Sequence, residues 1–124
     1  ATVMADFRKL HARLTEAGAD TAFCSFAFPD IDNLEKAERA YYEHDNALHW
    51  GGRYVTFATY CRAMGLFNRE LRRLSEDLGA AYIPVAERLR GGTRYFGDVC
   101  HMRDAGIARK AEIVADWLRE RWAR

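Results

Sequence analysis

The sequence predicts an α/β fold in which helices cover a parallel sheet. Two short apolar stretches, residues 20–28 and 80–86, are typical of buried strands, and three segments with helical periodicity alternate with them. The resulting order of helix, strand, long helix, strand and helix places parallel strands between layers of helix. Two strands alone would leave edges unpaired and too little sheet to be stable. Residues 1–124 are therefore expected to form the C-terminal portion of one larger domain.

The N-terminal segment is predicted to be an amphipathic helix that ends at Gly18, since glycine is common just after a helix C-terminus. Its apolar residues recur at steps of three and four positions: Val3, Phe7, Leu10, Leu14 and Ala17. The stretch 20–28, DTAFCSFAF, follows and ends at Pro29. Because it is nearly continuous in apolar and aromatic residues, we expect a strand that is covered on both faces and paired in parallel.

Residues 30–53 carry no sustained apolar stripe, which indicates a long excursion with one short helix. His44 and His49, with Glu43 and Asp45 nearby, match no specific zinc spacing. The sequence therefore predicts neither a metal site nor a cofactor.

Residues 54–78 give the strongest helical signal in the chain, and Gly79 follows them. One face of this helix is expected to contain Cys61, Met64, Phe67, Leu71, Leu74 and Leu78. The second apolar stretch has Pro84 near its end, and a connection rich in Gly and Arg, 87–97, leads to the last helix. Asp104 is expected to cap that helix, whose predicted apolar face contains Ile107, Ala111, Val114, Leu118 and Trp122.

Charge and cysteine content exclude some classes of function. Nineteen Lys and Arg against 18 Asp and Glu give a net charge of +1, so no strong field attracts a nucleic acid. No apolar stretch reaches the ~18 residues that a membrane span needs. Cys24, Cys61 and Cys100 have no paired spacing, which indicates reduced thiols and slightly favours a cytoplasmic location.

The segment YFGDVCHMRDAG, residues 95–106, places Asp98 three positions before His101 on the loop after the second strand. Active sites of open parallel sheets lie beyond the carboxyl ends of the strands. At this spacing Asp98 can accept the Nδ1 hydrogen of His101 and leave Nε2 free, which makes a general base. The alternative is structural: Asp98 satisfies loop amides and His101 packs before the helix.

Candidate nucleophiles are weak in this chain. Cys100 is adjacent to His101, but neighbouring side chains on an extended loop are expected to point in opposite directions. Ser25 is expected in a buried strand and Ser75 on the exposed face of a helix, and neither has the context of a nucleophile elbow.

Two segments resemble the C-terminal half of the SGNH (GDSL-type) hydrolase family: LFNRELRRLSEDLGAAYIPVAERL, and then RYFGDVCHMRDAGIARKAEIVADWL. The family pattern is an aromatic residue, D-x-x-H, a glycine and a helical alanine, which is matched here by Phe96, Asp98, His101, Gly106 and Ala111. The resemblance covers roughly residues 1–120, and its most specific part is 95–118.

The resemblance implies a three-layer α/β/α, flavodoxin-like fold and a serine esterase in which His101 deprotonates the serine and Asp98 orients the imidazole. The family's G-D-S segment and oxyanion-hole residues are not found in the chain. We therefore expect the N-terminal portion of the same hydrolase, as a separate or cleaved chain, to supply them. The substrate is expected to be a small-molecule ester, with Trp50 and Tyr54 as apolar walls of its pocket or as part of a lid.

An alternative function needs no catalysis. A non-catalytic α/β interaction module could bind a partner strand along its exposed sheet edge, and Asp98 and His101 would then be structural.

Overall fold

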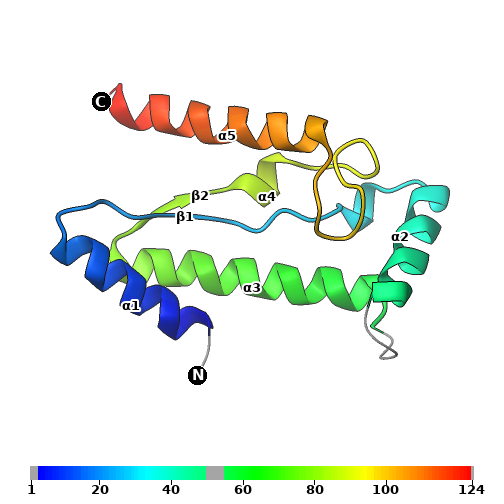
Figure 1. The fold of residues 1–124 in the computed structure, drawn as a ribbon, viewed down its shortest axis with the longest axis horizontal. Coiled ribbons are helices and arrows are strands. Elements are labelled where there is room, and N and C mark those ends of the chain that lie inside the picture. Colours follow the sequence, from blue (N-terminus) through cyan, green and yellow to red (C-terminus); the bar gives the residue numbers. More distant parts are fainter. Residues whose placement is uncertain (1–2, 50–54, 124) are drawn as a thin grey trace.

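A computed structural model describes residues 3–49 and 55–123 and shows a mixed α/β chain with a small two-stranded parallel sheet (Figure 1). Its elements, in order, are α1 (Val3–Glu16), β1 (Ala22–Cys24), the 3-10 turn η1 (Ile31–Asn33), α2 (Lys36–His49), α3 (Phe57–Leu78), β2 (Ala81–Ile83), α4 (Val85–Arg88) and α5 (Asp104–Trp122). The predicted alternation of helix and strand is confirmed. The excursion after β1 contains α2, which is longer than the short helix expected there.

The parallel pairing predicted for the two strands is confirmed, with Ala22 opposite Ala81 and Cys24 opposite Ile83. The strands have only three residues each, so the predicted strand lengths were wrong. β2 ends before Pro84, which has no amide hydrogen to donate. β1 pairs no further because β2 has ended; at Phe26, whose main-chain groups point away from β2, the side chain of Asn68 accepts from the amide (2.8 Å) and donates to the carbonyl oxygen (2.9 Å).

The expectation that the first strand is covered on both faces was wrong. Burial alternates along it: Phe23 and Ser25 are buried, whereas Cys24 is exposed and Phe26 is 39 % exposed. Phe23 packs with α1 and α3 in a small apolar cluster. On the opposite face, towards α5, Cys24 and Phe26 stay exposed because α5 packs mainly on α4 and leaves β1 largely uncovered.

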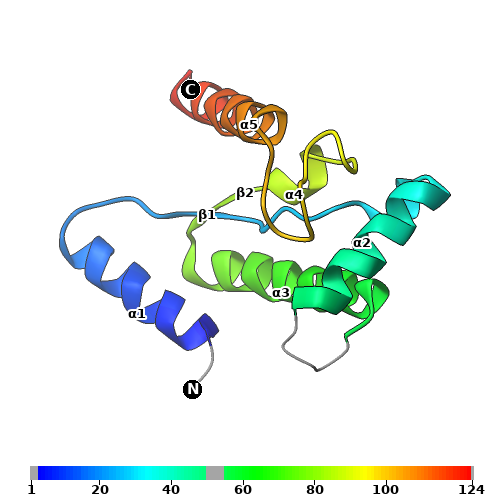
Figure 2. The same cartoon turned by 45° about the vertical axis from the view of Figure 1, so that its right-hand side comes forward.

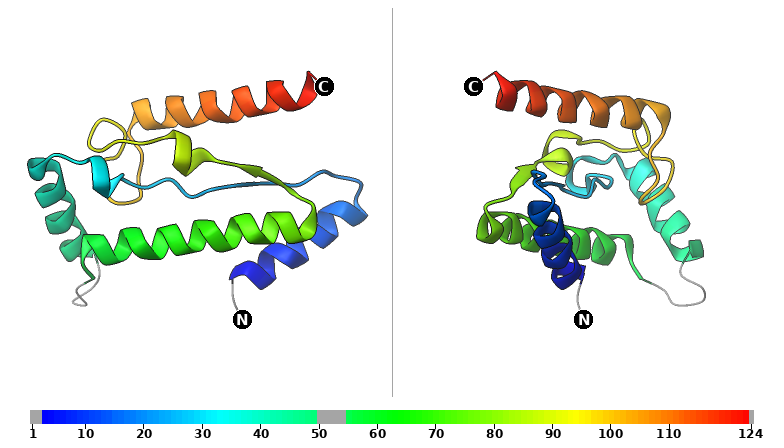
Figure 3. Two further views of the ribbon diagram at one scale, coloured as in Figure 1. Left: turned by 180° about the vertical axis from the view of Figure 1, so that it is seen from behind. Right: turned by 60° about the vertical axis from the view of Figure 1, so that its left-hand side comes forward.

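Helices lie on both sides of the two strands. Figures 1 and 2 show α5 on one side and α1 and α3 on the other, and both views in Figure 3 agree. The main core joins α2, α3, α4, α5 and the loop before α5, and its most deeply buried large side chains are Tyr42, Phe57, Val85, Leu89, Phe96 and Ile113. None of the described helices is long and apolar enough to cross a membrane.

The ends of α3 follow from local chemistry. The Thr56 hydroxyl accepts a hydrogen bond from the Thr59 amide (3.1 Å), which caps the N-terminus. Gly79 adopts a left-handed φ of 64° at the C-terminus, as its position in the sequence predicted. At α5 the predicted N-cap was wrong. Arg103 occupies the N-cap position without a side-chain hydrogen bond. Asp104 is the first helical residue, where its negative charge interacts favourably with the helix dipole.

The predicted apolar faces of α1 and α5 are only partly covered. No residue of α1 is buried, and its Val3 and Leu10 are 55 % and 49 % exposed. On α5 Ile113 is buried instead of Ile107, which is 57 % exposed. Apolar side chains at helical spacing on both helices therefore face solvent in this chain.

A polar network centred on Glu87 ties the sheet to the helices. Its carboxylate accepts hydrogen bonds from the Ser25 hydroxyl (2.7 Å), the Arg72 guanidinium (2.7 Å) and the Tyr82 hydroxyl (2.9 Å). Partial burial alone would raise the pKa of Glu87, but the bonds from Ser25 and Arg72 outweigh it and lower the pKa below the usual range. The charged carboxylate thus stabilises the fold at neutral pH.

Glu87→Ala is expected to lower the free energy of unfolding by about 2 kcal/mol, because charge-assisted hydrogen bonds are lost and a buried hydroxyl loses its partner. Glu112→Ala is the matched control, since the ion pair of Glu112 with Arg109 lies on the exposed face of α5 and its loss should cost about 0.5 kcal/mol or less. Urea denaturation followed by far-UV circular dichroism measures both. Equal losses in the two variants would contradict this role of Glu87.

Candidate functional site

The connection between α4 and α5 folds into a closed loop with Asp98 and His101 at its tip. Its two sides are joined by hydrogen bonds from the Arg103 amide to the Tyr95 carbonyl oxygen (2.8 Å) and from the Gly97 amide to the His101 carbonyl oxygen (2.9 Å). The loop lies beyond the carboxyl ends of both strands (Figure 1). This is the position that the sequence predicted for it.

Side chains from α2 hold the loop against the core. Phe96 is fully buried, and the Tyr42 hydroxyl donates a hydrogen bond to its carbonyl oxygen (3.1 Å). The neighbouring Tyr41 hydroxyl donates to the carbonyl oxygen of Gly97. Sequence reasoning missed this role of the two tyrosines, because they lie more than 50 positions from the loop and no local pattern links them.

Gly106, the glycine that follows D-x-x-H in the family pattern, cannot be replaced by a larger residue for steric reasons. A Cβ atom at Gly106 would collide with the carbonyl oxygen of Tyr95, because the first turn of α5 packs directly on the base of the loop. Only glycine allows this close approach.

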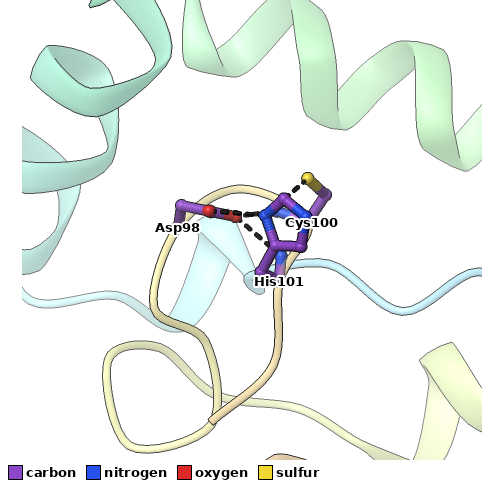
Figure 4. A group of neighbouring side chains, drawn as sticks. All are labelled: Asp98, Cys100 and His101. Atoms are coloured by element: carbon purple, nitrogen blue, oxygen red, sulfur yellow. Dashed lines mark hydrogen bonds and ion pairs between the residues drawn. The ribbon is translucent and has the colours of Figure 1, made fainter. Parts of the chain in front are cut away.

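Asp98 binds both the loop backbone and the imidazole (Figure 4). Its Oδ1 accepts hydrogen bonds from the amides of Cys100 (2.8 Å) and His101 (2.6 Å), and its Oδ2 lies 2.7 Å from His101 Nδ1. The two roles that the sequence left as alternatives, satisfying loop amides and orienting the imidazole, are thus combined in one side chain. The amide bonds fix the carboxylate in place for its contact with the ring.

The electrostatics favour a charged Asp98. Partial burial alone would raise the pKa of Asp98, but the two amide bonds and the contact with His101 outweigh it and lower the pKa to about 2. A carboxylate that is charged at neutral pH stabilises the tautomer with hydrogen on Nδ1 and leaves Nε2 as an acceptor. The His101 side chain is 81 % exposed, so its ring is open to solvent.

Cys100 does not point away from His101, so the expected divergence of these side chains was wrong. Its Sγ lies 3.5 Å from His101 Nδ1, because the two amide bonds to Asp98 curl the loop and bring both side chains to one side. Burial raises the pKa of the Cys100 thiol, and the Asp98 carboxylate raises it further. The thiol is therefore protonated at neutral pH, which does not favour a thiolate nucleophile.

His101 opens into a groove of about 540 Å³ between the helices on either side of β1. Its lining includes Cys24 of β1, Phe26 just after β1, and Ile107 of α5. The groove thus joins the exposed side of the first strand to the loop that carries Asp98 and His101.

The hydroxyl groups of both candidate serines already donate hydrogen bonds within the chain. Ser25 is 3 % exposed and donates its hydroxyl hydrogen to Glu87. Ser75 was expected on an exposed face, but it is 1 % exposed and its hydroxyl donates to the Leu71 carbonyl oxygen (2.9 Å). Neither hydroxyl is available to a substrate. Trp50 and Tyr54, the predicted substrate-pocket walls, lie outside the described residues.

Comparison with known proteins gives no match. No protein family, no curated protein and no solved structure is significantly similar to this chain.

Proposed function

We propose that the chain is the C-terminal part of a serine ester hydrolase of the SGNH (GDSL) type. In this proposal His101 is the general base, Asp98 positions its imidazole, and an N-terminal portion, as a separate or cleaved chain, supplies the serine and the oxyanion hole. The observation that carries it is the 2.7 Å contact between His101 Nδ1 and an amide-anchored Asp98 carboxylate, with the exposed ring above a groove. The flavodoxin-like three-layer fold belongs to the same proposal.

The uncovered apolar surfaces support a missing portion of the sheet. Main-chain groups of successive strand residues point to alternate sides, so those of Ala22 and Cys24 point away from β2, where the described residues provide no strand. Phe7 of α1 and Ile107 of α5 line the groove that runs beside this edge. An additional parallel strand beside β1 would cover them and would end near His101.

The proposed reaction uses the two residues as a base and its orienter. His101 Nε2 takes the proton of the external serine hydroxyl as the serine oxygen attacks the ester carbonyl carbon. The imidazolium, stabilised by Asp98, then gives this proton to the departing alcohol oxygen, and an acyl-serine remains. Water repeats the sequence with His101 again as base and releases the acid.

The substrate in this proposal is a small-molecule ester, and short-chain acyl esters such as acetylated carbohydrates are the first to test. Trp50 and Tyr54 as pocket walls stay a prediction, as does the alternative that they belong to a lid.

A fluorophosphonate probe tests the proposal, because it labels only activated serines. When the chain is purified from its source without denaturation, we expect label on a serine that lies outside residues 1–124, in a polypeptide continuous with the chain or tightly bound to it. The isolated chain should take no label, since Ser25 and Ser75 are buried and hydrogen bonded. Labelling of either serine would contradict the proposal.

The open edge of β1 also favours a second candidate, a non-catalytic module that binds a partner strand. The same experiment separates the two functions. A stable complex in which no serine is labelled would support the binding module and would count against the hydrolase.

A further inference from the structure

Three potential metal ligands meet at the tip of the loop before α5. One oxygen of Asp98, the sulfur of Cys100 and one ring nitrogen of His101 all lie within 4.8 Å of one another (Figure 4). Cys100 and His101 are exposed, so an ion can reach them from solvent. Among the described residues this is the one group of at least three such side chains.

The separation of sulfur and nitrogen suits a tetrahedral ion. Zinc–sulfur bonds of about 2.3 Å and zinc–nitrogen bonds of about 2.0 Å at a tetrahedral angle place the two ligand atoms about 3.5 Å apart. Cys100 Sγ and His101 Nδ1 are 3.5 Å apart. The distance between these two ligand atoms therefore already matches that of a tetrahedral site.

The carboxylate needs only a small shift. Zinc ligands of oxygen and nitrogen lie about 3.4 Å apart in a tetrahedral site, so Asp98 Oδ2, now 2.7 Å from the imidazole nitrogen, must withdraw by about 0.7 Å. The other oxygen, Oδ1, accepts hydrogen bonds from the amides of Cys100 and His101, which anchor the carboxylate beside the ring. Carboxylate ligands of metal sites are commonly held by such outer hydrogen bonds.

We propose that Asp98, Cys100 and His101 bind one Zn²⁺ ion, and that this binding competes with the general-base role of His101. The competition rests on the proposed function, whereas the metal site does not. On binding, the Cys100 thiol gives its proton to solvent and forms the zinc–sulfur bond. The proton on His101 Nδ1 passes through solvent to Nε2, so the nitrogen that acts as the base in the proposed reaction becomes a donor.

The ligand set selects zinc over the hard cations. Thiolate and imidazole favour Zn²⁺ and Co²⁺, whereas Mg²⁺ and Ca²⁺ prefer sites built from oxygen. This site departs from the sequence analysis, which predicted no metal site, because the structure brings Cys100 to the side of the loop where His101 lies.

The first test measures metal binding to the 124-residue chain itself. Competition with a chromophoric chelator should show one Zn²⁺ per chain, and Co²⁺ should give a thiolate-to-cobalt charge-transfer band. Cys100→Ser should abolish the band and raise the Kd for zinc at least about tenfold, the smallest loss typical of even a supporting residue in a metal site. Cys24→Ser is the matched control, because Cys24 is an exposed thiol in the same groove but outside the three-residue group, and it should leave both readouts unchanged.

Two results would overturn the metal site: no stoichiometric zinc binding, or the same Kd in Cys100→Ser as in the unaltered chain. The second test uses the complete hydrolase, which zinc should inhibit reversibly, with at least about tenfold more zinc needed for Cys100→Ser. Zinc binding to a protein whose complete form hydrolyses no ester would support the metal site and count against the proposed function alone.

Discussion

Replacing His101 with alanine is expected to lower kcat of the complete hydrolase by about 10⁴-fold to 10⁶-fold, because the proposed acceptor of the serine proton is lost. The side chain of His101 is 81 % exposed and its ring nitrogen contacts Asp98 of the same loop, so its removal should not unfold the chain. Hydrolysis of p-nitrophenyl acetate measures the effect.

His44→Ala is the matched control for this substitution, since His44 is an exposed histidine on α2 outside the loop. It should change kcat less than about twofold. Near-normal turnover of the His101 variant would remove the general-base assignment and with it the proposed mechanism.

Asp98→Asn is expected to lower kcat by about 10⁴-fold while KM changes little. The asparagine oxygen can still accept the hydrogen bonds that the amides of Cys100 and His101 now give to Oδ1. Its NH₂ group would face Nδ1, however, and would force the proton of the imidazole onto Nε2. The loop should therefore keep its shape, but the proton of His101 would be on Nε2, the nitrogen that has to accept the serine proton.

A pH titration of stability separates this positioning role from a merely structural one. The folded pKa of Asp98, about 2, is depressed below the ~3.9 of an unfolded aspartate, so its contribution is present above pH ~4 and is lost as pH falls towards 2. That contribution is about 3 kcal/mol in the unaltered chain and should be absent from Asp98→Asn. A variant that loses this pH dependence but retains full kcat would contradict the catalytic role of the carboxylate.

The sequence was most informative where structure depends on close neighbours. The contact between Asp98 and His101 spans three positions, and the glycine that ends α3 follows directly on its apolar pattern. Both features were predicted, because short-range geometry alone determines them. The direction of Cys100 was not, since it depends on two amide bonds that curl the loop.

Features that depend on distant segments could not be predicted. β1 is shorter than its apolar run because its distant partner β2 ends before Pro84, and Asn68, 42 positions after Phe26, binds the main chain of Phe26 on the other edge. Ser75 looked exposed by helical periodicity, yet its hydroxyl bonds to Leu71 within the helix and the residue is buried. The apolar faces of α1 and α5 were predicted as core surfaces, and the described residues contain too little chain to cover them.

The amide side chain of Asn68 imitates a peptide group when it donates to and accepts from Phe26 at once. Because both main-chain groups of Phe26 are already bonded, a strand added to the open edge of β1 can pair only with the two or three residues before Phe26. A short edge of this kind gives little main-chain binding energy to an arbitrary strand and protects the chain against edge-to-edge aggregation. Any true partner must gain its selectivity from side chains that fit the neighbouring apolar surfaces.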